Sequence, residues 1–147
     1  MITTVVDQLL KNPDRKFTYV EIKFFSMWWD QQTNETQAAV RQLIADGRFE
    51  FVNGGWSMHD EACPHYEDMI NNMWVGHQWL LDVLGVKPRI GWHVDPFGHS
   101  SANPRLFTDM GFEAWFFARL DYQDKEQREA DKSMNFLWRP FSEHFGN

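Results

Sequence analysis

Cysteine, basic charge and long apolar runs are all scarce in this sequence of 147 residues. Cys63 is the only cysteine, which excludes a disulfide within the chain and a zinc site built from several cysteines. Fourteen lysines and arginines stand against 21 acidic residues, and the resulting net charge of -7 argues against a nucleic-acid binder. The sequence has no apolar run long enough to span a bilayer and no recognisable signal peptide.

Aromatic residues, in contrast, are abundant, at 16% of the chain with eight tryptophans and thirteen phenylalanines. Large rings of this kind either fill a bulky core or provide flat apolar faces on which sugars stack. We favour the core for most of them. The length fits one modest domain, or part of one.

Segments with strand-like and helix-like apolar patterns alternate along the chain. Strands are predicted at residues 17–25, 49–58, 89–94, 114–120 and 135–139. Helices are predicted around residues 40–44, at 64–84 with Pro64 in the first turn and Gly85 at the end, at 101–110 and at 122–132. This alternation predicts an α/β fold with a parallel sheet.

The carboxyl ends of parallel strands meet at one edge of a sheet, where functional sites are usually built. The predicted strand ends bring residues 28–30, 56–61, 95–99 and 119–122 to that edge, and these segments are rich in polar and aromatic side chains. Gly54 and Gly55 lie near the end of the second strand, where missing side chains permit an unusual backbone or a close approach.

Asp95 is the most promising single residue, because it leaves a buried strand and Pro96 restricts its backbone to extended conformations. His93 shares its face if the strand continues that far, and His99 lies in the following turn. The residue types allow a metal site here. They equally allow histidines that only bond backbone carbonyls.

The segment Trp-His-Val-Asp-Pro-Phe-Gly-His-Ser at residues 92–100 resembles the nucleophile motif of glycoside hydrolase family 38, especially the lysosomal-type acid α-mannosidases. Three further stretches resemble the same family and occur in the family's order. They are FTYVEI with FFS in residues 17–26, NGGW with DEA in residues 53–62, and RLDYQDK in residues 119–125. Together the four stretches extend over nearly the whole chain.

The resemblance implies part of a seven-stranded, barrel-like β/α catalytic domain with parallel strands and one zinc ion. It assigns Asp95 as both nucleophile and zinc ligand, and places Phe97 in the sugar-binding pocket. Arg119 would contact the substrate and support the nucleophile, since its positive charge would keep Asp95 ionised. The alternative for Arg119 is an ordinary ion pair with Asp121 or Asp124.

A retaining glycosidase needs a nucleophilic carboxylate and a second one that acts as acid and then base. Zinc would orient sugar hydroxyls and act as a Lewis acid. The family's other zinc ligands and its acid/base residue are expected outside residues 1–147, which implies a domain truncated at both ends. We therefore predict that the isolated chain neither binds zinc tightly nor hydrolyses mannosides.

Other polar residues near these strand ends invite a role. Asp60 and Glu61 could complete an acid pair, but capping of the next helix or support of the sheet edge is the preferred interpretation. His59 and His65 match no ligand of the family. Trp56 could stack at the rim of a site or pack in the core.

The predicted function is a retaining, zinc-dependent α-mannosidase that removes terminal α-mannosyl residues from glycans. There are two alternatives. One is a metal-dependent enzyme that resembles polysaccharide deacetylases, and the other is a non-catalytic glycan-binding module that uses exposed tryptophans. The stretch at residues 119–125 and the glycosylation acceptor pattern Asn34-Glu35-Thr36 favour the lysosome or the secretory pathway. The sequence does not define an oligomeric state.

Overall fold

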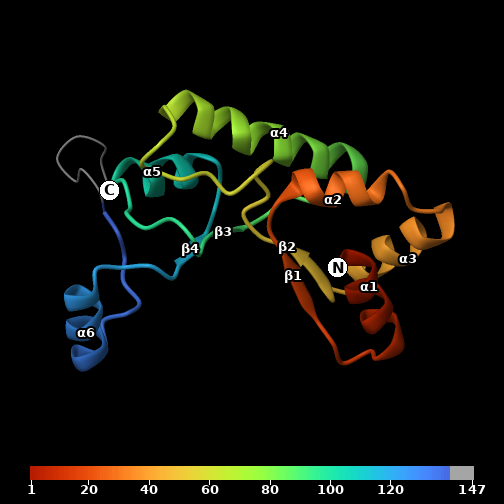
Figure 1. Ribbon diagram of the computed structural model, residues 1–147, viewed down its shortest axis with the longest axis horizontal. Helices are drawn as coiled ribbons and strands as arrows, with labels where there is room; N and C mark the ends of the chain where they lie inside the picture. Colours follow the sequence, from red (N-terminus) through yellow and green to blue (C-terminus); the bar gives the residue numbers. More distant parts are fainter. Residues whose placement is uncertain (140–147) are drawn as a thin grey trace.

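A computed structural model describes residues 1–139 of the chain. Six helices and four short strands follow one another along it (Figure 1). In order they are α1 (Ile2–Lys11), β1 (Phe17–Tyr19), α2 (Ile22–Trp29), α3 (Asn34–Ala45), β2 (Phe49–Phe51), α4 (Tyr66–Leu84), β3 (Ile90–His93), α5 (Ala102–Asp109), β4 (Ala114–Phe117) and α6 (Tyr122–Asp131).

The four strands form two parallel pairs, which confirms the predicted α/β class with parallel strands. Phe17 of β1 lies opposite Phe49 of β2, and His93 of β3 lies opposite Phe117 of β4. Asn53 links the pairs, because its N–H donates to Ile90 O at 2.6 Å and its Oδ1 accepts from Trp92 N at 3.2 Å. The described residues thus contribute four strands, and a seven-stranded barrel is not seen in them.

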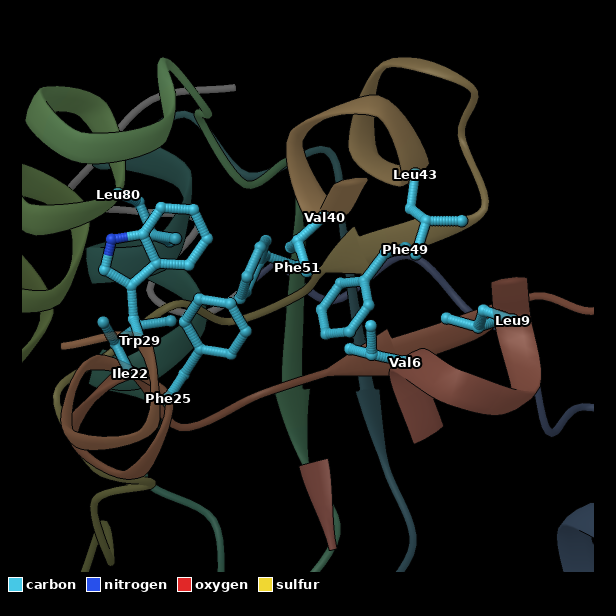
Figure 2. Close-up of a cluster of buried hydrophobic side chains, with 10 residues drawn as sticks. All are labelled: Val6, Leu9, Ile22, Phe25, Trp29, Val40, Leu43, Phe49, Phe51 and Leu80. Atoms are coloured by element: carbon cyan, nitrogen blue, oxygen red, sulfur yellow. The ribbon is translucent and has the colours of Figure 1, made fainter. Parts of the chain in front are cut away.

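The larger hydrophobic core lies around β1 and β2 (Figure 2). Phe25 is fully buried, and its ring meets that of Phe51 edge-on with 4.9 Å between centroids. Val6 and Leu9 of α1 pack beside Phe49. Most of the aromatic residues in this region fill the core, as predicted.

Trp56 is part of the same core, which settles its two alternatives. It is half-buried and packs against the buried cluster, with the ammonium group of Lys23 over its ring at 5.3 Å from the centroid. It therefore does not stand free at the rim as a stacking platform.

A smaller core of Met73, Phe107 and Phe112 packs against Trp115 of β4. Helix α4 joins the two cores, because Leu80 near its end enters the larger cluster while Met73 enters the smaller one. This long helix runs along both strand pairs (Figure 1). The packing of α4 therefore fixes one pair relative to the other.

Two of the predicted strands are wrong in length. The strand predicted at residues 17–25 ends at Tyr19, and α2 then buries Ile22, Phe25 and Trp29 with helical spacing. Residues 28–30 consequently lie at the end of a helix rather than a strand. The strand predicted at residues 49–58 stops at Phe51, and the chain then turns through positive φ at Asn53.

Three further differences concern helices and the last strand. Residues 135–139 form no strand. Pro64 precedes the N-cap His65 of α4 instead of lying in the first turn. Helix α1 was not predicted, although Ile2, Val6 and Leu9 are spaced for one buried helical face. The helices predicted around residues 40–44 and at 64–84, 101–110 and 122–132 are confirmed with small changes in their bounds.

Gly54 and Gly55 do lie at a close approach, as predicted. A Cβ at Gly76 of α4 would lie only 2.0 Å from Gly54 O, so the helix backbone rests directly on this turn. His77, one residue further along α4, donates from Nε2 to Asn53 O at 2.8 Å. Contacts between α4 and residues 53–55 therefore hold the turn that follows β2.

His77 also makes stability depend on pH. Burial lowers the pKa of His77 below its usual 6.5, because the cation would lose its hydration, while the bond to Asn53 O partly opposes the shift. The unfolded chain then takes up a proton at higher pH than the folded chain. The contribution of His77 to stability is thus fully present above about pH 6.5 and is lost as pH decreases through the folded pKa.

The variant His77→Gln keeps an N–H donor for Asn53 O but removes this titration. We expect the unfolding free energy of the full-length protein to fall less steeply below about pH 6.5, by at most about 1.4 kcal/mol per pH unit. Thermal unfolding at about pH 7 and about pH 5 measures the difference. His65→Gln changes an exposed histidine and is the control; equal pH dependence in wild type and His77→Gln would contradict the expectation.

Candidate active site

Asp95 and Arg119 leave neighbouring strands at the same edge. Because His93 lies opposite Phe117 in the parallel pair, the residues two positions further on in each chain are brought side by side. Arg119 Nη2 donates to Asp95 Oδ1 at 2.9 Å. The register of β3 and β4 thus produces this contact.

The contact identifies the partner of Arg119. Asp121 accepts from the backbone N–H groups of Gln123 and Asp124 at the start of α6, and the Asp124 side chain pairs with Arg128 at 3.0 Å. Arg119 pairs with Asp95 instead, so neither Asp121 nor Asp124 is its partner. The role of Arg119 toward a substrate stays a prediction.

Asp95 and Arg119 both face solvent, with 75% and 57% of their side-chain surfaces exposed. Exposed ion pairs contribute little to folding stability, so this pair is not explained by stability alone. His93, in contrast, is completely buried. Strand β3 ends at His93, so the alternation of its side chains between the two faces does not extend to Asp95. The strand expected to place both on one face is thus too short.

An open hollow of about 850 Å³ lies beside the pair. Arg119 lines it together with Phe97 and Tyr122, whose rings are both largely exposed. Trp138 contributes a further ring. Apolar ring faces next to charged and hydrogen-bonding groups are suited to a sugar, which has apolar C–H faces and polar edges.

A buried polar cluster lies beneath this surface. Glu61, whose side chain is 1% exposed, accepts from His99 Nδ1 at 2.6 Å and from Ser100 N at 3.1 Å. His93 Nδ1 lies 3.5 Å from the same carboxylate. His99 Nε2 donates to the backbone carbonyl of Arg119 at 2.8 Å.

Glu61 therefore supports the strand edge, which was the preferred interpretation, and does not cap α4, whose N-cap is His65. Its connection to His99 was not predicted, because the two residues lie 38 positions apart. The only available signal was that a DEA stretch and the motif at residues 92–100 follow successive predicted strands. That order predicts proximity but no particular contact.

The neighbouring polar residues have local roles. Asp60 accepts from Ala62 N at 3.0 Å, and this bond lowers the pKa of the Asp60 carboxyl. His59 bonds Asn103 through Nε2 at 3.0 Å, and burial lowers its pKa. His65 is exposed beside Glu67.

Two general properties concern the part of the chain that the structure describes. Within residues 1–139, no three histidine, cysteine, aspartate or glutamate side chains are grouped so that they could hold a metal ion. None of the helices in that range is both long and apolar enough to cross a membrane.

An α/β fold with a carboxylate and an arginine at adjoining strand ends is consistent with a glycoside hydrolase domain, and comparison with known families agrees. Residues 1–144 match the family described as glycosyl hydrolases family 38 N-terminal domain, so the chain belongs to that family. Its sequence is 50% identical over 138 residues to the lysosomal alpha-mannosidase of Dictyostelium discoideum, covering 94% of the chain and 14% of that protein.

Other relatives give the same result. The lysosomal alpha-mannosidase of Bos taurus is 51% identical over 141 residues, covering 95% of the chain and 14% of that protein. The crystal structure of an alpha-mannosidase from Enterococcus faecalis is similar to this chain, with a TM-score of 0.66 at 20% identity. The match covers 79% of this chain and 13% of the Enterococcus faecalis chain. The chain thus spans about one seventh of the curated relatives it matches.

Proposed function

We propose that this chain is part of a retaining, zinc-dependent α-mannosidase that removes terminal α-mannosyl residues from glycans. The observation that carries the proposal is the solvent-facing carboxylate of Asp95, held by Arg119 beside a ring-lined hollow. Family membership over residues 1–144 and relatives named lysosomal alpha-mannosidases support it. The four strands would be part of a seven-stranded barrel in the whole domain.

In the first step, an oxygen of Asp95 attacks the anomeric carbon of mannose and the glycosidic C–O bond breaks. The departing oxygen takes a proton from an acid located elsewhere in the protein, and a mannosyl ester of Asp95 forms. Water then attacks the same carbon while the conjugate base of that acid takes up its proton. The ester bond to Asp95 breaks, and mannose is released with its configuration retained.

Arg119 occupies one oxygen of Asp95 through its Nη2 atom. This contact leaves the other oxygen free to approach the sugar and orients the carboxylate for attack. Phe97, exposed at the edge of the hollow, would contact the apolar face of the mannose ring.

The side chains available in the described residues show how far this chain could hold the proposed zinc ion. Asp95 offers a solvent-accessible carboxylate, a type of ligand that zinc accepts, but protein zinc sites use three or four protein ligands. Residues 1–139 provide no such group, so the remaining ligands would come from the rest of the protein. Bound zinc would supply Lewis-acid stabilisation of the substrate oxygens.

The printed names of the relatives also bear on location. We propose the lysosome or the secretory pathway for the whole protein, in line with the lysosomal alpha-mannosidases to which the chain is similar. Asn34, in the acceptor pattern Asn34-Glu35-Thr36, is exposed at the start of α3, as a glycan attachment would require.

The test uses the full-length protein and a fluorinated mannosyl substrate whose glycosyl-enzyme is hydrolysed slowly. We expect a mass increase of one fluoromannosyl group on the peptide that contains Asp95, and none on other peptides. Release of acetate from acetylated polysaccharide without any adduct would instead support a deacetylase. Binding of mannosides without either reaction would support the glycan-binding module.

A further inference from the structure

We infer that Glu61 and His99 form a buried positioning pair that sets the geometry between Asp95 and Arg119. This inference rests on the proposed function, because its effect is measured on the reaction of Asp95. His99 lies at the wall of the hollow, whereas Glu61 is not among the residues that line it. Both act from below, through the backbone segments that carry the two exposed side chains.

Glu61 holds the segment that follows β3. Its Oε1 accepts from Ser100 N at 3.1 Å and its Oε2 accepts from His99 Nδ1 at 2.6 Å. Both oxygens are thereby used on two consecutive residues, one through the His99 side chain and one through the Ser100 backbone. The segment begins at Asp95 and ends at the start of α5, so Glu61 fixes it at its far end.

His99 reaches the segment that follows β4. Its Nε2 lies 2.8 Å from the backbone carbonyl oxygen of Arg119, the residue whose side chain holds Asp95. The path from Glu61 therefore runs through His99 to Arg119 and then to Asp95. It links three loops that are far apart in the sequence.

The two ring nitrogens of His99 both face acceptors, a carboxylate and a carbonyl. The side chains of Glu61 and His99 are 1% and 7% exposed, so these bonds are shielded from water. A glutamine at position 61 has nearly the same shape but only one acceptor oxygen, so it cannot accept from both Ser100 N and His99 Nδ1 as the carboxylate does.

The surface pair needs this support. The contact between Asp95 and Arg119 is an exposed ion pair, and such pairs contribute little free energy, so the contact orients the carboxylate but does not by itself fix the two backbone segments relative to one another. Near-attack geometry is demanding, since a misplacement of about 1 Å can cost about 100-fold in rate. The buried pair beneath supplies the rigidity that the surface pair lacks.

The experiment uses the full-length protein with Glu61→Gln, His99→Gln and the double variant, and Glu67→Gln as control. Glu67 is exposed in the first turn of α4 beside His65 and lies outside the buried cluster. Each protein is labelled with the fluorinated mannosyl substrate. The rate constant at saturation, the half-saturating concentration and the final number of adducts per chain are measured.

We expect each single variant to label about 10- to 100-fold more slowly at saturation, with nearly unchanged half-saturation and one adduct per chain at completion. The double variant should be no slower than the slower single one, because the two residues act as one unit. The control should label at the wild-type rate. Complete labelling shows that the folded fraction is intact.

Two results would overturn the inference. Labelling at the wild-type rate but with fewer adducts per chain would show a purely structural role, and additive losses in the double variant would show that the residues act separately. If Glu61→Gln yields no folded protein, His99→Gln decides by the same criteria. An unlabelled wild-type protein would instead refute the proposed function itself, and the inference with it.

Discussion

Replacing Asp95 by asparagine is expected to abolish mannoside hydrolysis by the full-length protein. Asparagine has nearly the same shape and keeps an oxygen that can accept from Arg119, so the contact seen at 2.9 Å can persist. The neutral amide, however, cannot form a stable glycosyl ester. We expect kcat to fall by about 10⁴- to 10⁶-fold, the scale on which nucleophiles and their activating groups act in enzymes with covalent intermediates.

Turnover of an aryl α-mannoside, zinc content and adduct formation are measured together, because Asp95 is proposed both to attack and to bind zinc. We expect zinc content to fall in Asp95→Asn, and excess zinc to restore the metal without restoring turnover. Asp82→Asn, on the exposed face of α4, is the matched control and should retain activity. Recovery of turnover by zinc alone would mean that Asp95 is a ligand and not the nucleophile.

The local patterns in the sequence predicted the α/β class and four of the helices, because apolar spacing in those segments matches their final packing. They failed where aromatic residues mark both strands and buried helices. In α2, Phe25 and Trp29 look strand-like by residue type, but packing against β1, β2 and α4 decides for a helix. The positive φ at Asn53, which ends the second strand early, did have a local signal, because asparagine adopts positive φ more readily than most residues and Asn53-Gly54 is a typical turn pair.

The site was predictable to a different degree. Asp95 stood out through its position after a strand and before Pro96, while its proposed role and those of Phe97 and Arg119 came from the family resemblance. The contact between Asp95 and Arg119 depends on the register of β3 and β4, which no local pattern specifies. The link from Glu61 to His99 depends on three loops meeting, so only the structure reveals it.

Stability should be most sensitive at Gly76, where α4 rests on the turn after β2. A Cβ there would lie 2.0 Å from Gly54 O and 2.7 Å from Trp56 N, and both of these atoms belong to the backbone. Backbone atoms cannot rotate away as a flexible side chain can, so the helix and the turn must separate. Gly76→Ala would gain about 1 kcal/mol of helix propensity, but overpacking of this kind typically costs about 1–3 kcal/mol and here should exceed that range.

The separation would also disturb contacts that lead toward the site. Trp56 N donates to Asn72 O at 2.9 Å, and Ser57 N donates to the Asn72 side chain at 2.9 Å, so the start of the loop that carries Glu61 is tied to α4. We therefore expect Gly76→Ala to lower both the yield of folded full-length protein and its Tm.

Gly47→Ala separates the close approach from the loss of a glycine as such. Gly47 has φ of 64° but no atom near the position of a Cβ, so alanine there meets backbone strain of only about 1–2 kcal/mol. Gly76→Ala should reduce Tm clearly more than this control. A Tm for Gly76→Ala at or above that of Gly47→Ala would show that α4 and the turn can move apart freely, and that the position of the Glu61 loop does not depend on their contact.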